Sequence, residues 1–407
     1  MTKQYDVIIV GASAAGLVAA ITAARGGARA ALFEKLPRAG KKLLATGNGR
    51  CNLSNTAAAR HDYRNADFAA AALAQCPVSD TLDFFRSLGL LTYTDSAGRI
   101  YPMSNTASSV SDALRAGAAA AGVSLFCGTA VVSVTKTDDL FAAETQRGED
   151  GVTAIFHAPK LVLATGGKAA PKQGSDGSGY ALARQLGHSI TPLAPSLVPL
   201  VTQTRAIKPL KGLRVHDAEL RLTRGDTLLG ETRGEILFTD YGLSGIAAME
   251  LSRCAAFSLP AQLTLDLLPA LTATELRDFL HTQAQARAAD AAELLLSGLL
   301  PKAVGLAVYK AANVPLCSLG DLHKKDVNAL TQTAKAFPLP VTATKDFAAA
   351  QVTAGGVSVT EFHPQTLESR ICQGLYCAGE ILDIDGGCGG FNLQWAWSSG
   401  MLCGQQV

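Results

Sequence analysis

The chain has 407 residues, of which 48% are hydrophobic and 17% are charged, and its formal net charge is +2. This length and composition predict two or three domains with a large core. The basic residues are scattered, which argues against a nucleic-acid-binding protein, and no apolar run approaches the ~20 residues needed to cross a bilayer. The N-terminus carries no signal-peptide pattern, so we expect a soluble, cytoplasmic protein.

Nine cysteines occur in the chain, and no two of them form a C-x-x-C pair. The odd count and the missing pair spacing favour reduced thiols that are buried or incidental. His281 and His323 have no second histidine or cysteine nearby at the spacing of metal ligands. We therefore predict surface histidines and no metal site.

The N-terminal stretch predicts a strand, a tight turn and a helix. Tyr5–Val10 is a short apolar run, and Leu17–Arg25 is an Ala-rich helical segment. Between them, Gly11, Ser13 and Gly16 have the spacing of a dinucleotide-binding turn, with Ser13 in place of the usual middle glycine. Such a turn brings the backbone close to a pyrophosphate, and the helix N-terminus offers N–H groups to its oxygens. An ordinary glycine-rich turn is the alternative.

A second apolar run, Ala28–Phe33, ends in Glu34. This acid lies near the offset of about 20 residues from the turn that is typical of dinucleotide-binding proteins. A carboxylate there can accept the ribose hydroxyl hydrogens of an adenosine. The Gly- and Asn-rich stretch Gly40–Asn55 follows, and its composition predicts an irregular loop that is held by what it contacts. A solvated basic loop is the alternative.

Helical and strand-like patterns then alternate. Phe68–Gly89 and Ser108–Gly122 have helical spacing, whereas Val123–Lys136 is expected to pair with Phe141–His157 as strands. A strand near Val131 can contact an adenine ring through its backbone.

Two later segments predict a return of the chain to the first, parallel sheet. Lys160–Gly167 is a buried-type strand that ends in two glycines, and a helix is expected within Gly174–His188. Near the C-terminus, Leu375–Ala378 is a further strand, after which Gly386–Gly390 form a loop that leads into a helix from about Asn392.

Between the two segments that rejoin the parallel sheet, the predicted secondary structure changes twice. From Ser189, short strands and turns predict a mostly antiparallel subdomain, with strands at Leu197–Thr202, Ala218–Leu222, Thr227–Gly230 and Glu235–Thr239. Gly242–Gly245 is expected to start a short helix that reaches about Arg253. Leu271–Leu300 then opens with Thr272 and Glu275 at capping-box spacing, and Pro301 heads another helical stretch.

A dinucleotide-binding domain reached from three distant places implies a long ligand, and FAD fits this better than a nicotinamide nucleotide. We expect Gly11–Gly16 to hold the pyrophosphate, Glu34 the adenosine ribose, and Gly379 with Glu380 the flavin-side phosphate and ribityl chain. Reduced flavin carries negative charge at its N1/C2 carbonyl edge, which N–H groups at the start of the last helix can stabilise. A glycine-rich cap that packs Trp395 and Trp397 is the alternative.

The candidate cofactor-binding residues come from all of these segments. They are Gly11, Ser13, Ala14, Ala15, Gly16, Glu34, Lys35, Lys42, Thr46, Gly47, Asn48, Gly49, Arg50, Cys51, Asn52, Val131, Thr165, Gly166, Gly167, Gly379, Glu380, Asp383, Gly390, Phe391, Asn392 and Leu393. No catalytic residue is assigned, because spacing reveals no Ser-His-Asp or paired-carboxylate arrangement. Arg50 is a candidate to orient a carboxylate or carbonyl, or to anchor the cofactor, and Cys51 is a candidate reactive thiol.

Together these motifs resemble the BaiN-like, or aminoacetone-oxidase-type, family of bacterial FAD-dependent oxidoreductases. The motifs are GASAAG, GKKLLATGNGRCNLSN, LATGG with GSDGSGYALARQLGH and PSLVPL, GLSG, VTAGGV with TLESR, and GLYCAGEILDIDGGCGGFNLQWAWSSG. The resemblance implies that the Thr46–Asn52 loop lies beside the flavin. The chain departs from the family beside the GLSG turn, where Asp240 and Ile246 replace the His and Pro that are often found there.

The resemblance and the composition shifts predict one α/β fold. It is a Rossmann-like FAD-binding domain of the two-dinucleotide-binding flavoprotein type, interrupted by a β-rich and a helical subdomain. The expected boundaries are 1–190 plus 345–407 for the FAD-binding domain, 191–269 plus about 336–344 for the β-rich subdomain, and 270–335 for the helical subdomain.

The expected function is FAD-dependent hydride transfer between a small organic substrate and the flavin. NAD(P)H is a possible transient donor, since the chain has no second nucleotide fingerprint. The first alternative is an O₂-using oxidase of a small amine, and the second is a flavin-binding partner in RNA or protein modification. The only basic cluster that suits RNA is Arg205, Lys208, Lys211 and Arg214. We expect no stable nucleic-acid partner and no membrane partner; the oligomeric state is left open.

Overall fold

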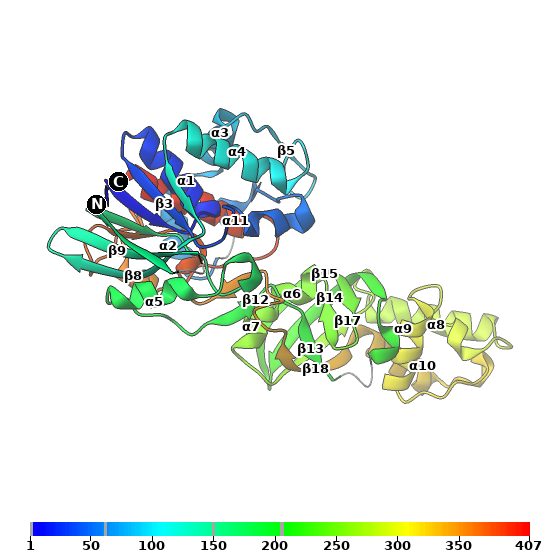
Figure 1. Cartoon of the computed structure of the whole chain (residues 1–407). Coiled ribbons are helices and arrows are strands. Elements are labelled where there is room, and N and C mark those ends of the chain that lie inside the picture. Colours follow the sequence, from blue (N-terminus) through cyan, green and yellow to red (C-terminus); the bar gives the residue numbers. More distant parts are fainter. Residues whose placement is uncertain (1–2, 61–62, 149–150, 204–206) are drawn as a thin grey trace. The chain divides into compact units, whose positions relative to one another are not determined.

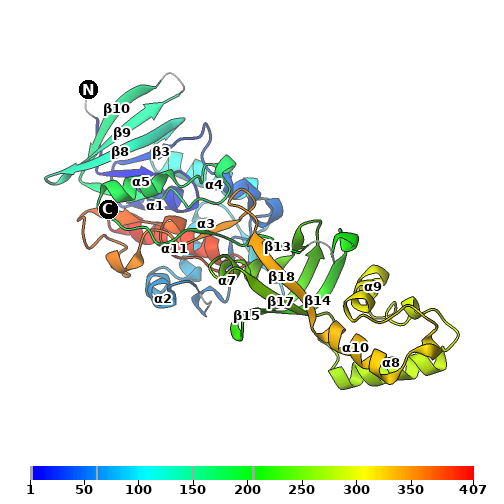
Figure 2. The same cartoon turned by 90° about the horizontal axis from the view of Figure 1, so that it is seen from below.

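The structure is a computed structural model that describes residues 3–60, 63–148, 151–203 and 207–407. The chain forms two compact units, Met1–Ala194 with Gln351–Val407 and, between them, Pro195–Ala350. In Figures 1 and 2 the blue N-terminal and red C-terminal elements lie side by side, so both ends of the chain build the first unit. The three domain boundaries expected from the sequence remain a proposal.

The first unit is built on a parallel sheet. Each strand pairs in parallel with its neighbours, and the central strands are buried along their whole length. Continuous apolar runs suit this position because helices or a second sheet cover both faces of a parallel sheet. In spatial order the strands are β20 (Leu375–Cys377), β11 (Lys160–Leu163), β2 (Val7–Val10), β3 (Ala30–Glu34) and β7 (Ser124–Cys127).

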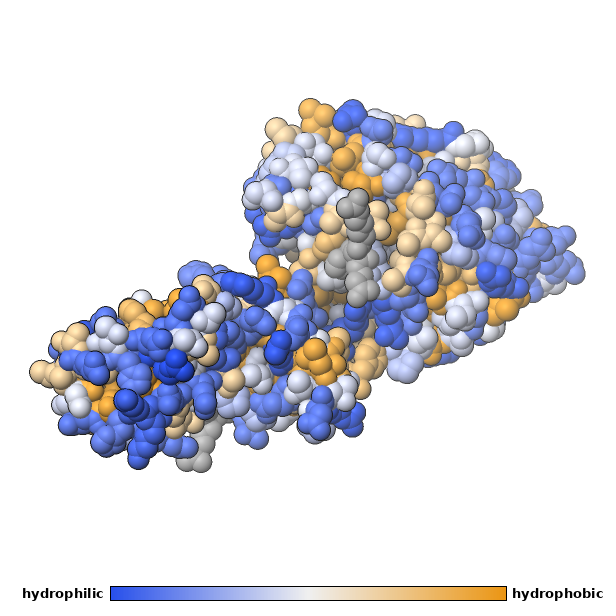
Figure 3. Space-filling view, turned by 180° about the vertical axis from the view of Figure 1, so that it is seen from behind, coloured by the Kyte–Doolittle hydropathy of each residue, from blue (hydrophilic) through white to orange (hydrophobic). Residues whose placement is uncertain are grey.

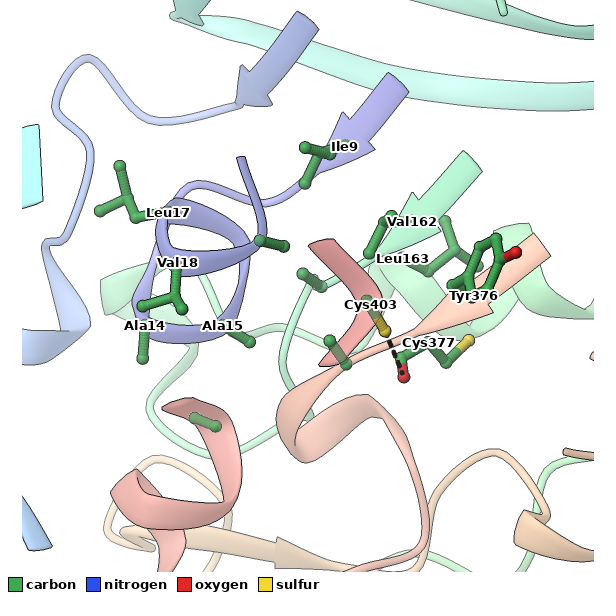
Figure 4. Close-up of a cluster of buried hydrophobic side chains, with 14 of the residues drawn as sticks. Ile9, Ala14, Ala15, Leu17, Val18, Val162, Leu163, Tyr376, Cys377 and Cys403 are labelled. Carbon is green, nitrogen blue, oxygen red and sulfur yellow. Dashed lines mark hydrogen bonds between the residues drawn. The ribbon is translucent and has the colours of Figure 1, made fainter. Parts of the chain in front are cut away.

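The helices α1 (Ala14–Arg25) and α11 (Phe391–Gln405) pack closely beside this sheet. Figure 4 shows α1 side chains, strand side chains and Cys403 of α11 in one apolar cluster. A Cβ placed on Gly400 lies 2.5 Å from the Ala15 carbonyl oxygen, and one on Gly404 lies 2.6 Å from that of Ala19. Small residues therefore let the first and last helices touch through their backbones, a contact that sequence analysis missed.

A second sheet covers the other side of the parallel sheet. Phe156 lies 4.8 Å from Phe33, ring centroid to ring centroid, and Phe33 stacks on Phe126 at 5.0 Å. These contacts join the two sheets through an aromatic core. The order of the second sheet is β1 (Lys3–Gln4), β10 (Val152–Ala158), β9 (Leu140–Arg147) and β8 (Thr129–Thr137).

Two predicted elements of this unit need correction. The helical stretch Phe68–Gly89 is two helices, because Pro77 cannot continue the first one. The stretch Val123–Lys136 is divided between β7, a strand of the parallel sheet, and β8. The remaining elements are β4 (Ser54–Asn55), α2 (Ala66–Gln75), α3 (Val78–Ser87), β5 (Thr92–Thr94), β6 (Arg99–Pro102), α4 (Ala107–Ala120), α5 (Ser178–Gln185) and β19 (Val352–Ala354), with β12 (Ala194–Ser196) at the boundary of the units.

The second unit contains a closed antiparallel barrel, as the strand-rich pattern predicted. Two predicted strands, Thr227–Gly230 and Glu235–Thr239, belong to one long strand, and Gly242 begins a barrel strand before the expected helix. Around the barrel the order is β13 (Leu200–Thr202), β16 (Gly242–Ser244), β15 (Thr227–Phe238), β14 (Arg214–Arg224), β17 (Ala261–Asp266) and β18 (Phe337–Thr344).

Helices complete the second unit. Thr272 caps its helix and forms the predicted capping box with Glu275, and Pro301 precedes the next long helix, as expected. The helices are α6 (Ile246–Glu250), α7 (Ser252–Ala256), α8 (Ala273–Ala286), α9 (Lys302–Ala311) and α10 (Lys324–Lys335). The predicted fold class, a Rossmann-like domain interrupted by β-rich and helical parts, is confirmed.

The surface agrees with the composition. On the face shown in Figure 3, hydrophobic residues form small groups among polar ones. Within the described ranges, no helix is long and apolar enough to span a membrane, and no cluster of His, Cys, Asp and Glu has the form of a metal site. All nine cysteines are free, as predicted.

Candidate functional site

The first glycine-rich turn lies between β2 and α1 and is held by backbone contacts. Gly11 has φ +101°, and a Cβ placed there lies 2.5 Å from the Ala164 carbonyl oxygen. A Cβ on Gly16 lies only 1.8 Å from the Gly11 carbonyl oxygen. Ser13 precedes the helix without capping it through its side chain. The N–H groups of the first helical turn thus donate no hydrogen bond to the Ser13 side chain, and the start of a helix is a favourable place for an anion.

Glu34, at the end of β3, holds this turn from the neighbouring strand. Its carboxylate accepts hydrogen bonds from the backbone N–H of Ala12 at 3.0 Å and of Leu36 at 2.9 Å. The side chain is buried, and burial raises the pKa of Glu34, although both N–H bonds act in the opposite direction. Because each carboxylate oxygen has two lone pairs, Glu34 keeps acceptor capacity for a ribose. This second role of Glu34 is not visible in the sequence.

Glu380 connects three loops that follow the strand ends. Its Oε2 lies 2.6 Å from Lys42 Nζ, and its Oε1 accepts the Thr353 backbone N–H at 2.8 Å. Thr353 Oγ1 in turn accepts the N–H groups of Lys168 and Ala169. The structure therefore brings together Lys42 and Glu380, two separately predicted site residues, but Thr353 was missed. Its only sequence signal is its place in the VTAGGV motif.

The loop Thr46–Asn52 has an unusual backbone. Gly47, Asn48 and Cys51 all have left-handed φ values, and the Cys51 N–H bonds the Thr46 carbonyl oxygen at 3.0 Å. Cys51 is fully buried, and burial raises the pKa of its thiol to about 12. The reactive-thiol interpretation of Cys51 is therefore wrong, because a nucleophilic cysteine must be a thiolate.

Asn52 lies where this loop meets the last helix. A Cβ placed on Gly390 lies 2.8 Å from Asn52 Oδ1 and 2.4 Å from the Ser54 carbonyl oxygen. Asn52 Oδ1 is buried and accepts no hydrogen bond from any residue that the structure describes. Buried acceptors are normally satisfied, so this oxygen marks a position where a ligand donor is missing.

The loop before α11 is shaped by the side chain of Asn392. Its Nδ2 donates to the carbonyl oxygens of Gly386 at 2.8 Å and Gly387 at 3.2 Å, and its Oδ1 accepts the Gly386 N–H at 2.9 Å. Gly390 is the left-handed N-cap, and no side chain caps the helix there. The first N–H groups of the helix precede its first intrahelical bond and donate to no N-cap side chain. Trp395 and Trp397 are buried, so the packing role also holds.

Arg50 is held by three neighbouring side chains. Its Nε donates to Asn105 Oδ1 at 2.7 Å, its Nη2 donates to the Tyr93 hydroxyl at 3.1 Å, and its guanidinium carbon lies 4.4 Å from the Tyr101 ring centroid. These three partners come from β5, β6 and the residues after them. The sequence predicted Arg50 as a site residue and missed the side chains that fix it.

The other candidates are placed as follows. Lys35 forms an ion pair with Asp176 at 2.6 Å. Asp383 is paired with Arg64, and Val131 lies half-buried in β8. Gly379 has φ +75°, and a Cβ there lies 3.0 Å from that of Ala15, so the last strand end meets the first helix. Ala14 is the first residue of α1, Phe391 and Leu393 lie in the first turn of α11, Gly49 lies in the Thr46–Asn52 loop, and Thr165, Gly166 and Gly167 follow β11.

Comparisons with known proteins fit this geometry. Residues 5–406 match the family described as HI0933-like protein Rossmann domain. The chain belongs to this family. The resemblance drawn from the motifs is confirmed, and with it the enzyme class, a flavoprotein oxidoreductase.

Two curated relatives span nearly the whole chain. A 3-dehydro-bile acid delta(4,6)-reductase of Clostridium scindens is 38% identical over 98% of this chain and 97% of its own length. A ribosomal RNA dihydrouridine synthase of Escherichia coli is 30% identical over 100% of this chain and 98% of its own length. Among solved structures, 3-ketosteroid delta1-dehydrogenase from Sterolibacterium denitrificans shares the fold, with a TM-score of 0.55. The match covers 100% of this chain and 99% of that one, at 15% sequence identity.

Proposed function

We propose that the chain binds FAD along the turns that precede α1 and α11. Two observations support the fit. The first turn is crowded on its protein side at Gly11 and Gly16, and the side chain of Ser13 does not cap the helix that follows it. Asn52 Oδ1 is a buried acceptor without a partner beside the start of α11, and a flavin N3–H is a donor of the kind it lacks.

In this proposal, each turn binds a different part of FAD. The N–H groups after Ser13 bind the pyrophosphate, and Glu34 binds the adenosine ribose. Gly379 and Glu380 hold the flavin-side phosphate and ribityl chain, with Lys42 compensating the charge of Glu380 at 2.6 Å. When bound, FAD supplies hydride transfer at its flavin ring.

The start of α11 controls the electrostatics of the flavin edge. Its first N–H groups, those of Phe391, Asn392 and Leu393, precede the first intrahelical bond, which runs from the Gln394 N–H to the Gly390 carbonyl oxygen at 2.9 Å. These donors and the helix dipole stabilise negative charge. Asn392 fixes the loop in front of them, so the donors are in position before the charge develops. This arrangement raises the reduction potential of the bound flavin.

The substrate class follows from what two relatives have in common. A delta(4,6)-reductase acting on a 3-dehydro bile acid and a dihydrouridine synthase both saturate a C=C bond conjugated with a carbonyl group. We infer that this chain reduces such a bond in a small molecule. The overall reaction consumes one NAD(P)H and one proton and yields NAD(P)⁺ and the saturated carbonyl compound.

RNA is the competing substrate, and the charges of the barrel argue against it. Lys211 Nζ lies 2.8 Å from Asp240 Oδ2, and Arg214 forms an ion pair with Glu235. Arg205, the first member of the predicted basic cluster, lies outside the described residues. Side chains already neutralised by acids release few counterions on binding phosphate. Salt-dependent retention of RNA by the purified protein would favour this alternative.

The decisive experiment is anaerobic reduction of the purified protein. We expect a yellow protein that releases FAD on denaturation, whose flavin is bleached by NADH or NADPH and recoloured by an unsaturated ketone. Rapid bleaching by aminoacetone, with none by either nicotinamide nucleotide, would instead establish the amine oxidase. A colourless protein that takes up no added FAD would refute both functions.

A further inference from the structure

One exposed face beside the Thr46–Asn52 loop is not used by the cofactor scheme. It lies on the hairpin of β5 and β6, where Tyr93 pairs with Tyr101 across the strands. The two rings are stacked at a centroid distance of 5.8 Å and an interplanar angle of 26°. Arg50 covers Tyr101 at 4.4 Å. The three side chains form a cationic aromatic cluster, which we call the Arg50 platform.

The Arg50 platform continues into an apolar surface. The Met103 N–H bonds the Leu91 carbonyl oxygen at 2.8 Å, so these two residues extend the hairpin by one more pair. Since side chains alternate along a strand, Leu91 and Met103 lie on the same face as the two tyrosines. Both are 62% exposed. A large apolar pair that remains open to solvent beside a fixed cation suits a flat apolar ligand with one polar end.

Arg50 retains hydrogen-bonding capacity on this face. A guanidinium has five N–H donors, and the bonds found for Arg50 use Nε towards Asn105 and Nη2 towards Tyr93. The side chain is exposed, and the Nη1 edge has no partner among the described residues. Tyr93, Tyr101 and Asn105 fix the plane of the guanidinium, so little conformational entropy is lost when the free edge binds an oxygen atom.

The platform is connected to the proposed flavin site through the backbone. Arg50 is two residues from Asn52, whose Oδ1 lies beside Gly390 at the start of α11. The Asn55 side chain donates to the Gly389 carbonyl oxygen at 3.0 Å, so β4, which follows the loop, is also joined to the turn before α11. A ligand held by Arg50 therefore lies next to the loop expected beside the flavin.

We propose that the Arg50 platform is the substrate-recognition site of the enzyme and that it selects planar, apolar ring compounds with a conjugated carbonyl. Arg50 donates to the carbonyl oxygen, and the ring system lies on the surface of Leu91 and Met103. During reduction, hydride adds to the β-carbon of the C=C–C=O unit and negative charge develops on the carbonyl oxygen as an enolate, which the guanidinium stabilises. The enolate then takes up the one proton of the overall reaction at its α-carbon, which gives the saturated ketone. This inference depends on the proposed function and adds the residue that determines specificity.

The test is equilibrium binding to the oxidised FAD-loaded protein, followed by the change in the flavin spectrum. Testosterone serves as the conjugated ketone, and the matching allylic alcohol, in which a hydroxyl replaces the conjugated carbonyl, serves as its partner. We expect Arg50→Met to weaken ketone binding about tenfold, as for loss of a charged hydrogen bond. Binding of the alcohol should change by less than about twofold, since a neutral hydroxyl gains little from the charge.

Two further variants sharpen the result. Tyr93→Phe keeps the ring but removes the hydroxyl that positions Arg50, and a smaller loss of ketone affinity, about threefold, is expected. Arg86→Met is the matched control, since Arg86 is an exposed arginine of α3 whose partner is Asp83; its affinities should equal those of the wild type. FAD content and flavin reduction potential are measured for every variant, so that a loss of ketone affinity is distinguished from a loss of cofactor.

Several outcomes overturn the inference. They are equal weakening for ketone and alcohol, unchanged ketone affinity in Arg50→Met, and loss of FAD from that variant, which would make Arg50 a cofactor anchor. A wild-type protein that takes up FAD and binds neither probe also refutes the platform, while the cofactor proposal stands. A protein that never binds FAD refutes the proposed function itself.

Discussion

The first and last glycine-rich turns of the parallel-sheet unit are both proposed to bind FAD, but different interactions fix their conformations. The turn before α1 is fixed by backbone packing, since the space for a Cβ at Gly16 is taken by the Gly11 carbonyl oxygen. The turn before α11 is fixed by a side chain, since Asn392 makes three hydrogen bonds to Gly386 and Gly387. A turn that is fixed by close packing cannot accept an additional side-chain atom. A turn that is fixed by hydrogen bonds can accept a larger side chain nearby but cannot lose its hydrogen-bond donor.

The largest effect on FAD binding and stability is expected for Gly16→Ala, in the turn that is fixed by packing. The new Cβ would lie 1.8 Å from the Gly11 carbonyl oxygen, so the turn must move, and we expect loss of FAD together with a fall of about 3 kcal/mol in the free energy of unfolding. Urea denaturation and flavin content measure the two effects. Gly298→Ala is the control, because a Cβ at Gly298 meets nothing within 4 Å. A variant that keeps FAD and wild-type stability would show that the turn is not sterically fixed.

Asn392→Asp should have an intermediate effect that falls on the cofactor more than on the fold. The change replaces the donor to Gly386 and Gly387 by an acceptor and puts negative charge at the start of α11. We expect FAD affinity to fall about tenfold or more and the reduction potential of the remaining bound flavin to become more negative. Asn328→Asp, at an exposed position of α10, controls for the added charge. An unchanged potential would contradict the assigned role of α11.

The smallest effect on stability is expected at the N-terminal ends of β2 and β3, which are the ends away from the first glycine-rich turn. Arg29 donates from its side chain and backbone to Asp6, which lowers the pKa of Asp6 to about 2. A depressed carboxyl pKa contributes stability that is present above the unfolded pKa and is lost as the pH falls towards 2. Asp6→Asn should therefore cost at most about 1 kcal/mol at neutral pH, because solvent screens exposed ion pairs.

The pH dependence of the unfolding free energy distinguishes the Asp6–Arg29 ion pair from the two glycine-rich turns. Unfolding free energies of wild type and Asp6→Asn should converge below about pH 2 and differ most near neutrality, with FAD content equal in both. A difference that grows as the pH falls would have the wrong sign and would exclude the ion pair as its cause.

Local patterns in the sequence were sufficient for much of the fold. The run from Tyr5 to Glu34 predicted strand, turn and strand because each depends on near neighbours along the chain. Thr272 and Glu275 predicted a capping box for the same reason. The extra strands β7 and β16 were missed, since pairing in a sheet depends on partners far away in the chain. The split at Pro77 has a local signal, the proline itself, which sequence analysis by helical spacing overlooked.

The sequence by itself determined the dinucleotide-binding pattern, the α/β class and the family, because spacing along the chain carries that information. Only the tertiary structure decided what surrounds the candidate residues. It buried Cys51, joined Glu380 to Thr353, left Asn52 Oδ1 without a partner and placed Arg50 on Tyr101. Burial and hydrogen bonding between distant segments arise only when the chain packs, and they determine which of the candidate side chains can act.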